Sequence, residues 1–162
     1  MSQDSISERT HFRAATDADI AAIVEIEAAG FSNDAERFSA RKIRSLLRSP
    51  RTNVLVAELH GKVTGWIAGF VVTRNPRPWG RIYALAVHPT VRGLRLGKTL
   101  ARKMIEILRS RGARVIVLEV REGNDKAESL YRSLGFQPCR QLPDYYGPGL
   151  HARRMVLDSM DY

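Results

Sequence analysis

A basic, glycine-punctuated turn that follows an apolar run is the first feature of this sequence that could bind a ligand. The stretch from Ile82 to Lys98 predicts a buried strand, a tight turn and the start of a helix. A strand that leads through a turn into a helix directs unpaired backbone N–H groups and the positive end of the helix dipole at one point. Arg92 and Arg95 add positive charge to the same turn. The stretch therefore predicts an anion site, and a phosphate-bearing ligand is its natural occupant.

This turn differs from the two common nucleotide-binding loops. Gly93 and Gly97 enclose three residues, whereas a Walker loop has four residues between its glycines before Lys-Ser/Thr. The turn also lacks the glycines of a Gly-x-Gly-x-x-Gly motif. A helix N-terminus without a ligand therefore remains the alternative interpretation at this point.

Two further side chains could move protons. Glu119 stands in an otherwise apolar run, and desolvation of a carboxylate there would make it a stronger base, as a general base requires. The alternative is an ion pair with a neighbouring arginine such as Arg121, or a side chain turned to solvent at the end of the strand. Tyr131 lies on a predicted short helix, where a phenol could donate a proton to a leaving group that departs as an anion. Ordinary packing is the alternative for Tyr131.

The hydrophobic pattern predicts one mixed sheet that positions these residues. Helices are expected from a capping box at Thr16 to about Gly30, from Ser39 to Pro50, from the basic turn to Gly112, and from an N-cap at Asn124 to Leu134. Strands are expected at 12–14, 53–59, 62–72, 82–87, 115–120, 137–142 and 152–157, with a proline-containing loop at 74–80. This order predicts an α/β fold with a central mixed, mostly antiparallel sheet and helices on both faces. Residues 81–120 form a crossover unit, and ligands bind beyond the strand ends of such sheets.

Length and composition fit a single globular domain. The chain has 162 residues, of which 44% are hydrophobic, so we expect a flexible tail at 1–10 and one domain at 11–158. A lone cysteine, Cys139, and the absence of an apolar leader suggest the cytoplasm, and the strand around Cys139 favours a buried thiol. No apolar run is long enough to cross a membrane, and no histidine or cysteine spacing predicts a metal site.

The formal net charge of +9 raises the question of an anionic partner. One basic cluster, from Arg37 to Arg51, is interpreted as a solvated helix face, and a second begins in the basic turn. A nucleic-acid-binding module is a rival from another functional class. It is disfavoured because the sequence has no helix-turn-helix, RNP or zinc signature.

Four motifs follow one another in the second half of the chain. They read Val87-His-Pro-x-x-Arg-Gly-x-x-x-Gly, Leu118-Glu-Val-Arg, Asn124 with Ala127, and Leu130-Tyr-x-x-Leu-Gly-Phe136. Together they resemble the GNAT superfamily of acetyl-CoA-dependent N-acetyltransferases, and within it the RimI-like N-terminal acetyltransferases. The resemblance is strongest over 81–157, and Phe12-Arg-x-Ala-Thr-x-x-Asp extends it more weakly to the start of the domain.

The resemblance implies an enzyme that transfers the acetyl group of acetyl-CoA to a primary amine, without a covalent enzyme intermediate. Glu119 would be the general base and Tyr131 the general acid. The implied cofactor-binding residues are Leu85, Ala86 and Val87 for the pantetheine arm, Arg92, Gly93, Leu94, Arg95, Leu96, Gly97 and Lys98 for the pyrophosphate, and Asn124. The acceptor would be a protein N-terminus or, alternatively, a small-molecule amine or a lysine side chain. A CoA-binding regulatory domain without turnover is disfavoured because both positions implied for catalysis are filled.

The sequence departs from the family pattern in two places. Arg95 stands where the phosphate turn usually has a glycine, so either the chain is helical enough there to tolerate a side chain or the cofactor sits differently. We expect the first, with the guanidinium near a phosphate. The family's Tyr-Tyr pair is present as Tyr145 and Tyr146, but His151 replaces the acid that normally follows.

We therefore expect four aromatic side chains around the acceptor, with loop packing as the alternative: Phe31, Phe38, Tyr145 and Tyr146. The expected partners are acetyl-CoA and an amine acceptor, with no metal and no membrane. The oligomeric state is left open between a monomer and a homodimer.

Overall fold

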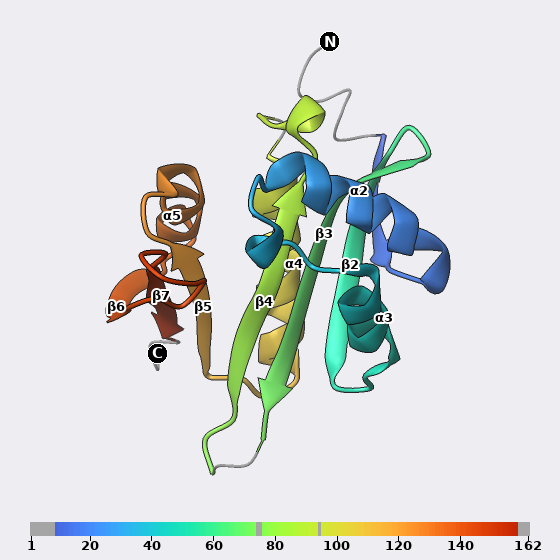
Figure 1. Cartoon of the computed structure of the whole chain (residues 1–162). Helices are drawn as coiled ribbons and strands as arrows, with labels where there is room; N and C mark the ends of the chain where they lie inside the picture. Colours follow the sequence, from blue (N-terminus) through green and yellow to red (C-terminus); the bar gives the residue numbers. More distant parts are fainter. Residues whose placement is uncertain (1–8, 74–75, 94, 159–162) are drawn as a thin grey trace.

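The computed structural model describes residues 9–73, 76–93 and 95–158. A seven-stranded sheet has the order β1-β2-β3-β4-β5-β7-β6 (Figure 1). Neighbouring strands are antiparallel except β4 and β5, which are parallel. The strands are β1 (Thr10–Ala14), β2 (Thr52–Leu59), β3 (Lys62–Val72), β4 (Trp79–Val87), β5 (Val115–Arg121), β6 (Gln137–Leu142) and β7 (Ala152–Asp158). The predicted mixed, mostly antiparallel sheet is confirmed.

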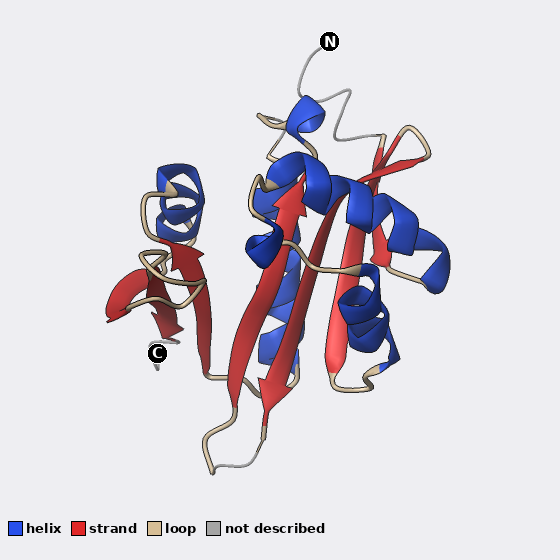
Figure 2. Ribbon diagram, viewed as in Figure 1, coloured by secondary structure: helices blue, strands red, loops and turns tan. Residues whose placement is uncertain are grey.

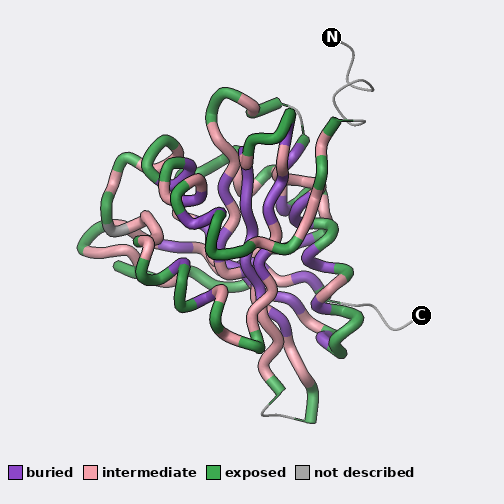
Figure 3. Tube along the Cα trace, turned by 90° about the vertical axis from the view of Figure 1, so that its right-hand side faces the viewer, coloured by how far each residue is buried: buried purple, intermediate pink, exposed green. Residues whose placement is uncertain are grey.

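Helices cover both faces of this sheet (Figure 2). The α-helices are α2 (Ile20–Gly30), α3 (Ala40–Arg48), α4 (Leu96–Ser110) and α5 (Asp125–Ser133), and the short 3₁₀ helices are η1 (Asp17–Asp19), η2 (Asp34–Glu36) and η3 (Pro89–Val91). Helices α2 and α3 pack on one face around Ile23, Ile43 and Trp66. Helix α4 packs on the other face, where Leu100, Met104 and Ile116 belong to a second buried cluster. Buried residues accordingly follow the central strands and the inner sides of the helices (Figure 3).

Local capping explains where three helical segments begin. The backbone N–H of Thr16 donates to Asp19 Oδ2 at 2.8 Å, which forms the predicted capping box in front of α2. Ser39 Oγ accepts from the N–H of Lys42 at 3.2 Å at the start of α3. Asn124 Oδ1 accepts from the N–H of Ala127 at 3.2 Å at the start of α5. These starts were predicted because a cap needs only residues that are close in sequence.

Strand β4 begins earlier than predicted. Trp79 and Gly80, which were expected in a loop, pair with Val72 and Val71 of β3. A proline restricts its own backbone and the residue before it but not the residues after it, so the chain can become extended directly after Pro78. A side chain at Gly80 would place its Cβ 3.1 Å from Leu108, so this glycine lets α4 pack closely against the strand.

Strands β4 and β5 separate soon after they meet. They pair only over Trp79–Arg81 and Val115–Val117, and then diverge (Figure 1). In β4 the register against β3 shifts, so that Ala68 faces Ala84 while Gly69 faces Ile82. A bulge of this kind adds a residue to one strand and bends it. The result is an opening between the two strands in the middle of the sheet.

Two smaller expectations concern the edges of the domain. Most of the predicted tail, residues 1–8, lies outside the described residues, and β1 begins at Thr10. Cys139 was predicted to be a buried thiol, but it is exposed. It lies in β6, an edge strand of the sheet whose residues are mostly exposed. In the described part of the chain, no helix is both long and apolar enough to span a membrane.

Candidate active site

A cavity of about 700 Å³ lies at the opening between β4 and β5. Its walls come from α2, η2, the segment that leads into α3, the diverging parts of β4 and β5, the start of α5, and the β6–β7 loop. Many of the residues singled out from the sequence meet here: Glu119, Tyr131, Leu85, Asn124, Phe31, Phe38, Tyr145 and Tyr146 all line the cavity. The fold therefore brings the expected proton-transfer residues and the expected acceptor aromatics to one site.

Glu119 is held by two arginines. Its side chain is 5% exposed. Oε2 accepts from Arg81 Nε at 3.1 Å and lies 2.9 Å from Arg81 Nη2. Oε1 accepts from Arg154 Nε and Nη2 at 3.0 and 2.9 Å. A carboxylate has about four lone-pair positions, and these four nitrogens surround it. The alternative of a carboxylate paired with arginine is therefore confirmed, but Arg121 is not the partner, because it instead forms an ion pair with Glu36 at 2.7 Å.

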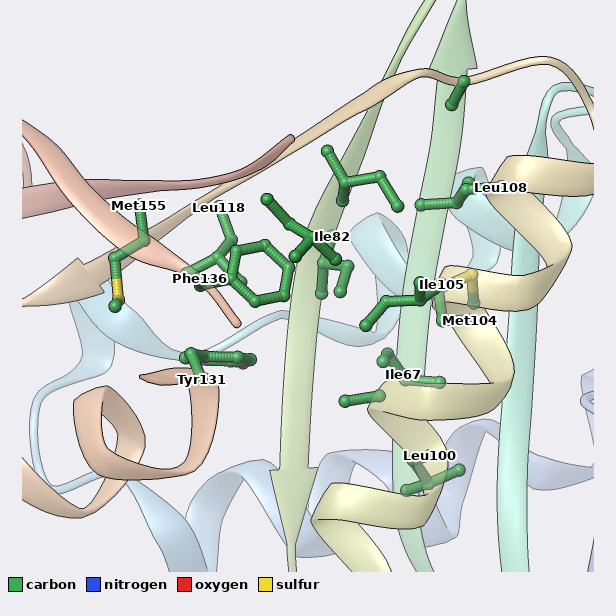
Figure 4. Close-up of a cluster of buried hydrophobic side chains, with 14 of the residues drawn as sticks. Ile67, Ile82, Leu100, Met104, Ile105, Leu108, Leu118, Tyr131, Phe136 and Met155 are labelled. Atoms are coloured by element: carbon green, nitrogen blue, oxygen red, sulfur yellow. The ribbon is translucent and has the colours of Figure 1, made fainter. Parts of the chain in front are cut away.

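Tyr131 projects from α5 into the edge of the second buried cluster. Its ring meets Phe136 edge-on, with centroids 5.7 Å apart, and Figure 4 shows the two rings together at one end of the cluster. Burial raises the pKa of the Tyr131 phenol well above its ordinary value. The phenol therefore keeps its proton at neutral pH and can act as a proton donor toward the cavity.

The basic turn leads into α4, and Arg95 is its irregular residue. Arg95 is the N-cap of α4 and has φ 58° and ψ 20°, in the left-handed region. The expectation that the chain is helical at Arg95 is wrong, because the helix begins one residue later, at Leu96. Leu94, also assigned to the pyrophosphate, lies outside the described residues. Arg92 points toward the end of α2, since its Nη2 is 3.8 Å from where a Cβ of Gly30 would lie.

The other expected cofactor groups that the structure describes lie at the end of β4 and the starts of α4 and α5, and of these only Leu85 and Asn124 line the cavity. Gly97 lies close to the end of β4 and to α5, since a Cβ there would be 3.4 Å from Leu130 and 3.6 Å from Val87. In the described sheet, β4 beyond Arg81 has no strand on the side of β5, so backbone groups on that edge can pair with an extended ligand. Leu85, Ala86 and Val87 belong to this part of β4, and Leu96 and Lys98 to the first turn of α4. Asn124 uses its side-chain oxygen as a cap, which leaves its amide nitrogen for a ligand.

The acceptor loop, residues 143–151 between β6 and β7, carries the tyrosine pair. The rings of Tyr145 and Tyr146 meet edge-on with centroids 4.9 Å apart, and Tyr145 Oη accepts from Arg81 Nη2 at 2.7 Å. Burial, with the neighbouring Tyr145, Glu119 and Glu36, raises the pKa of Tyr146 to about 12. His151 has a conformational role, because its Nδ1 accepts from the backbone N–H of Asp144 at 3.0 Å.

Sequence reasoning missed several polar residues of the site. Arg81 and Arg154 were not singled out, because only the strand register places them beside Glu119. Glu27 was not singled out as a site residue either, yet it is 2% exposed and lines the cavity. Its oxygens accept from Trp66 Nε1 at 2.9 Å and from the N–H of Phe38 at 3.2 Å. Burial raises the pKa of Glu27 to about 6. A carboxylate next to Ile26 in an otherwise apolar stripe was the available signal.

Metal ligands do not gather in this structure. Among the residues that it describes, no group of three or more His, Cys, Asp or Glu side chains is arranged to hold a metal ion.

The chain is similar to known acetyltransferases in both sequence and structure. Residues 20–136 match the Acetyltransferase (GNAT) family. A Bacillus subtilis protein, provisionally named a ribosomal protein bS18-alanine N-acetyltransferase, is 34% identical over 79% of this chain and 81% of its own. The N-alpha-acetyltransferase RimI of Mycobacterium tuberculosis is 32% identical over 91% of this chain and 92% of its own. The crystal structure of the Escherichia coli ribosomal-protein-S18-alanine N-acetyltransferase has a TM-score of 0.81 at 25% identity, covering 94% of this chain and 96% of that one.

Proposed function

Because the chain belongs to the GNAT acetyltransferase family, and so is an acetyl-CoA-dependent N-acetyltransferase, we propose that it acetylates the N-terminal α-amino group of a protein. The observation that carries the proposal is the single cavity lined by Glu119, Tyr131 and the pair Tyr145 and Tyr146. Transfer of an acetyl group from a thioester to an amine needs a proton acceptor and a proton donor at one place. The carboxylate and the neutral phenol can fill these roles, and the two acceptor-loop tyrosines can contact the amine acceptor. We expect the reaction to take place in the cytoplasm.

The proposed acceptor is the N-terminus of ribosomal protein bS18. Two relatives that match most of the chain are named for N-acetylation, one at an N-alpha position and one on bS18 alanine, and the tyrosine pair lines the cavity. A lysine side chain or a small amine is the second candidate. It is favoured by His151, which stands where an acid is expected and contacts the loop backbone rather than the cavity.

The cavity and the adjoining start of α4 fit a CoA thioester. The unpaired edge of β4 can hydrogen-bond the pantetheine arm, and the N–H groups of the first turn of α4 can meet the pyrophosphate. Acetyl-CoA supplies a thioester whose carbonyl carbon is open to attack by an amine. A backbone N–H near Val87 would stabilise the negative charge that develops on the carbonyl oxygen.

The proton transfers are assigned to Glu119 and Tyr131. As the new N–C bond forms, the amine must lose a proton, and Glu119 receives it through a water that takes the place of one of the four guanidinium contacts on its oxygens. As the C–S bond breaks, Tyr131 donates its proton to the departing thiolate. Nothing becomes covalently attached to the protein.

A direct assay tests the acceptor. The protein is incubated with acetyl-CoA and a peptide of the bS18 N-terminus, and free thiol release is followed while mass spectrometry locates the acetyl group. The same peptide with a blocked α-amino group, a lysine-containing peptide and polyamines serve as comparisons. Acetylation of only the free α-amino group is expected. Modification of lysine or a polyamine instead would refute the acceptor, and the lack of any thermal shift with acetyl-CoA would contradict the cofactor assignment.

Substitution of the two proton-transfer residues tests the mechanism. Glu119→Gln and Tyr131→Phe should each lower kcat by about 100-fold or more, because general acid and base catalysis contributes about 10²–10⁴-fold. The KM for acetyl-CoA should change little. Glu122→Gln removes another cavity carboxylate and serves as the matched control. Wild-type turnover in either test variant would refute the role given to that residue.

A further inference from the structure

We propose that Arg81 is a positioning residue that joins the Glu119 carboxylate to the acceptor loop through Tyr145. The inference rests on the proposed function of the same cavity. Arg81 lies outside every motif of the sequence. Through its guanidinium, the geometry of the base Glu119 depends on the acceptor loop.

The position of Arg81 in the sheet makes this link possible. Arg81 is the last residue of β4 that pairs with β5, so it lies where the two strands begin to separate. Its side chain is 21% exposed and lines the cavity. The guanidinium also lies 5.1 Å from the centroid of the Tyr83 ring, which limits the directions in which it can point.

One end of this guanidinium serves two partners. Arg81 Nη2 lies 2.9 Å from Glu119 Oε2 and donates to Tyr145 Oη at 2.7 Å, while Nε donates to the same Oε2 at 3.1 Å. A planar, forked guanidinium holds such partners in a fixed relation, which a single ammonium group cannot do. A shift of Tyr145 toward an acceptor would therefore also act on Oε2 of Glu119.

Arg154 also binds Glu119, so its contacts can be compared directly with those of Arg81. It lies directly opposite Glu119 on β7 and binds the other oxygen, Oε1, through Nε and Nη2. Within the part of the chain that the structure describes, Arg154 makes no hydrogen bond or ion pair with the acceptor loop. Both arginines hold the carboxylate, but only Arg81 joins it to Tyr145.

This difference predicts a split in kinetic constants. Arg81→Gln should lower kcat and also raise the KM for the acceptor, each by about tenfold, because it disturbs both the base and the loop. Arg154→Gln should lower kcat with less than a twofold change in acceptor KM. Arg81→Lys should recover part of kcat while the acceptor KM stays raised, because an ammonium cannot reproduce the fork. Equal acceptor KM values for the glutamine variants would overturn the proposal.

A measurement on the free protein keeps the proposal testable even if the acceptor is a different amine. The Nε–H resonances of Arg81 and Arg154 can be followed by NMR in protein labelled with ¹⁵N-arginine, and assigned with the variants Arg81→Lys and Arg154→Lys. Tyr145→Phe removes only the phenolic oxygen, so it should shift the Arg81 resonance and leave that of Arg154 in place. An unmoved Arg81 resonance, or equal shifts of both, would refute the link. Failure of peptide acetylation alone would refute only the proposed acceptor.

Discussion

Arg95 adopts a backbone conformation that residues other than glycine rarely adopt. Its φ of 58° lies in the left-handed region, where a Cβ costs about 1–2 kcal/mol. The family that the sequence resembles has a glycine at this position of the phosphate turn. Arg95 retains the left-handed conformation that a glycine would adopt, which suggests that the turn requires this conformation. The guanidinium then offers a separate advantage, such as a contact with a phosphate.

Replacing this residue should separate the two effects. Arg95→Gly should raise the free energy of unfolding by about 1 kcal/mol, because the strain is relieved, and should raise the KM for acetyl-CoA by about tenfold, because a charge-assisted hydrogen bond is lost. Urea unfolding and initial-rate kinetics measure the two quantities.

His60→Gly is the matched control for Arg95→Gly. His60 also has a positive φ, 52°, but it lies in the β2–β3 turn. Its replacement should stabilise the protein without changing KM. An unchanged KM in Arg95→Gly would show that Arg95 is only a tolerated substitution.

The residues of the site that could be predicted are those within sequence motifs. Glu119, Tyr131 and Tyr145, which line the cavity, were singled out because their neighbours form recognisable patterns. Arg81 and Arg154 lie 38 and 35 positions from Glu119, and only the pairing of three strands brings them to its oxygens. Arg121, the near neighbour that was considered, instead reaches Glu36. Proximity in sequence was therefore a poor guide to the partners of this carboxylate.

Among the elements, the helix starts were more predictable than the course of β4. A cap such as Ser39 bonds to a residue only three positions away, so the sequence contains the whole signal. The start of β4 at Trp79 and the bulge near Tyr83 depend on the pairing with β3, which is not visible in a local window. The exposure of Cys139 likewise depends on β6 being at the edge of the sheet. The cavity in turn depends on the pairing and the bulge of β4, which involve residues far apart in the sequence.

The start of α5 combines a structural role with an expected ligand contact. Asn124→Ala should lower the free energy of unfolding by about 1 kcal/mol, because it removes the cap of Ala127. Asn124→Asp should keep this stability, since a carboxylate also caps a helix, but it should weaken acetyl-CoA binding because the amide donor is replaced by a negative charge.

Thermal unfolding and calorimetric titration with acetyl-CoA test the two Asn124 variants. Equal acetyl-CoA affinities for the aspartate variant and the wild type would mean that Asn124 is only a cap.

At the scale of the whole molecule, the opening in the sheet divides the strands into two groups. Strands β1 to β4 and strands β5, β7 and β6 are joined by only a short parallel pairing. The buried cluster under α4 spans both groups, since it contains Ile67 of β3 as well as Leu118 of β5 and Met155 of β7 (Figure 4). This core allows the two strands to diverge on one side without dividing the domain, so the active-site cavity can form within a continuous fold.

Glu27 connects three elements on the opposite face and should make the stability of the whole molecule depend on pH. It joins α2 to Trp66 of β3 and to the segment before α3. Its pKa is raised from 4.5 to about 6 by burial, so the folded state binds the proton more tightly than the unfolded state. The stability associated with this proton is fully present below about pH 4.5 and is lost as the pH rises through about 6, a change of about 2 kcal/mol.

Glu27→Gln cannot lose a proton, so this part of the pH dependence should disappear in the variant. Measured by urea unfolding, the free energy of unfolding of wild type relative to Glu27→Gln should fall by about 2 kcal/mol between about pH 4.5 and pH 7. Taking the difference at each pH removes the constant cost of placing an amide beside the N–H of Phe38. Glu25→Gln, which removes an exposed carboxylate from the same helix, controls for the change in net charge. A difference that stays constant, or that grows in favour of wild type at higher pH, would mean that hydrogen bonds from Trp66 and Phe38 outweigh the desolvation of the carboxylate.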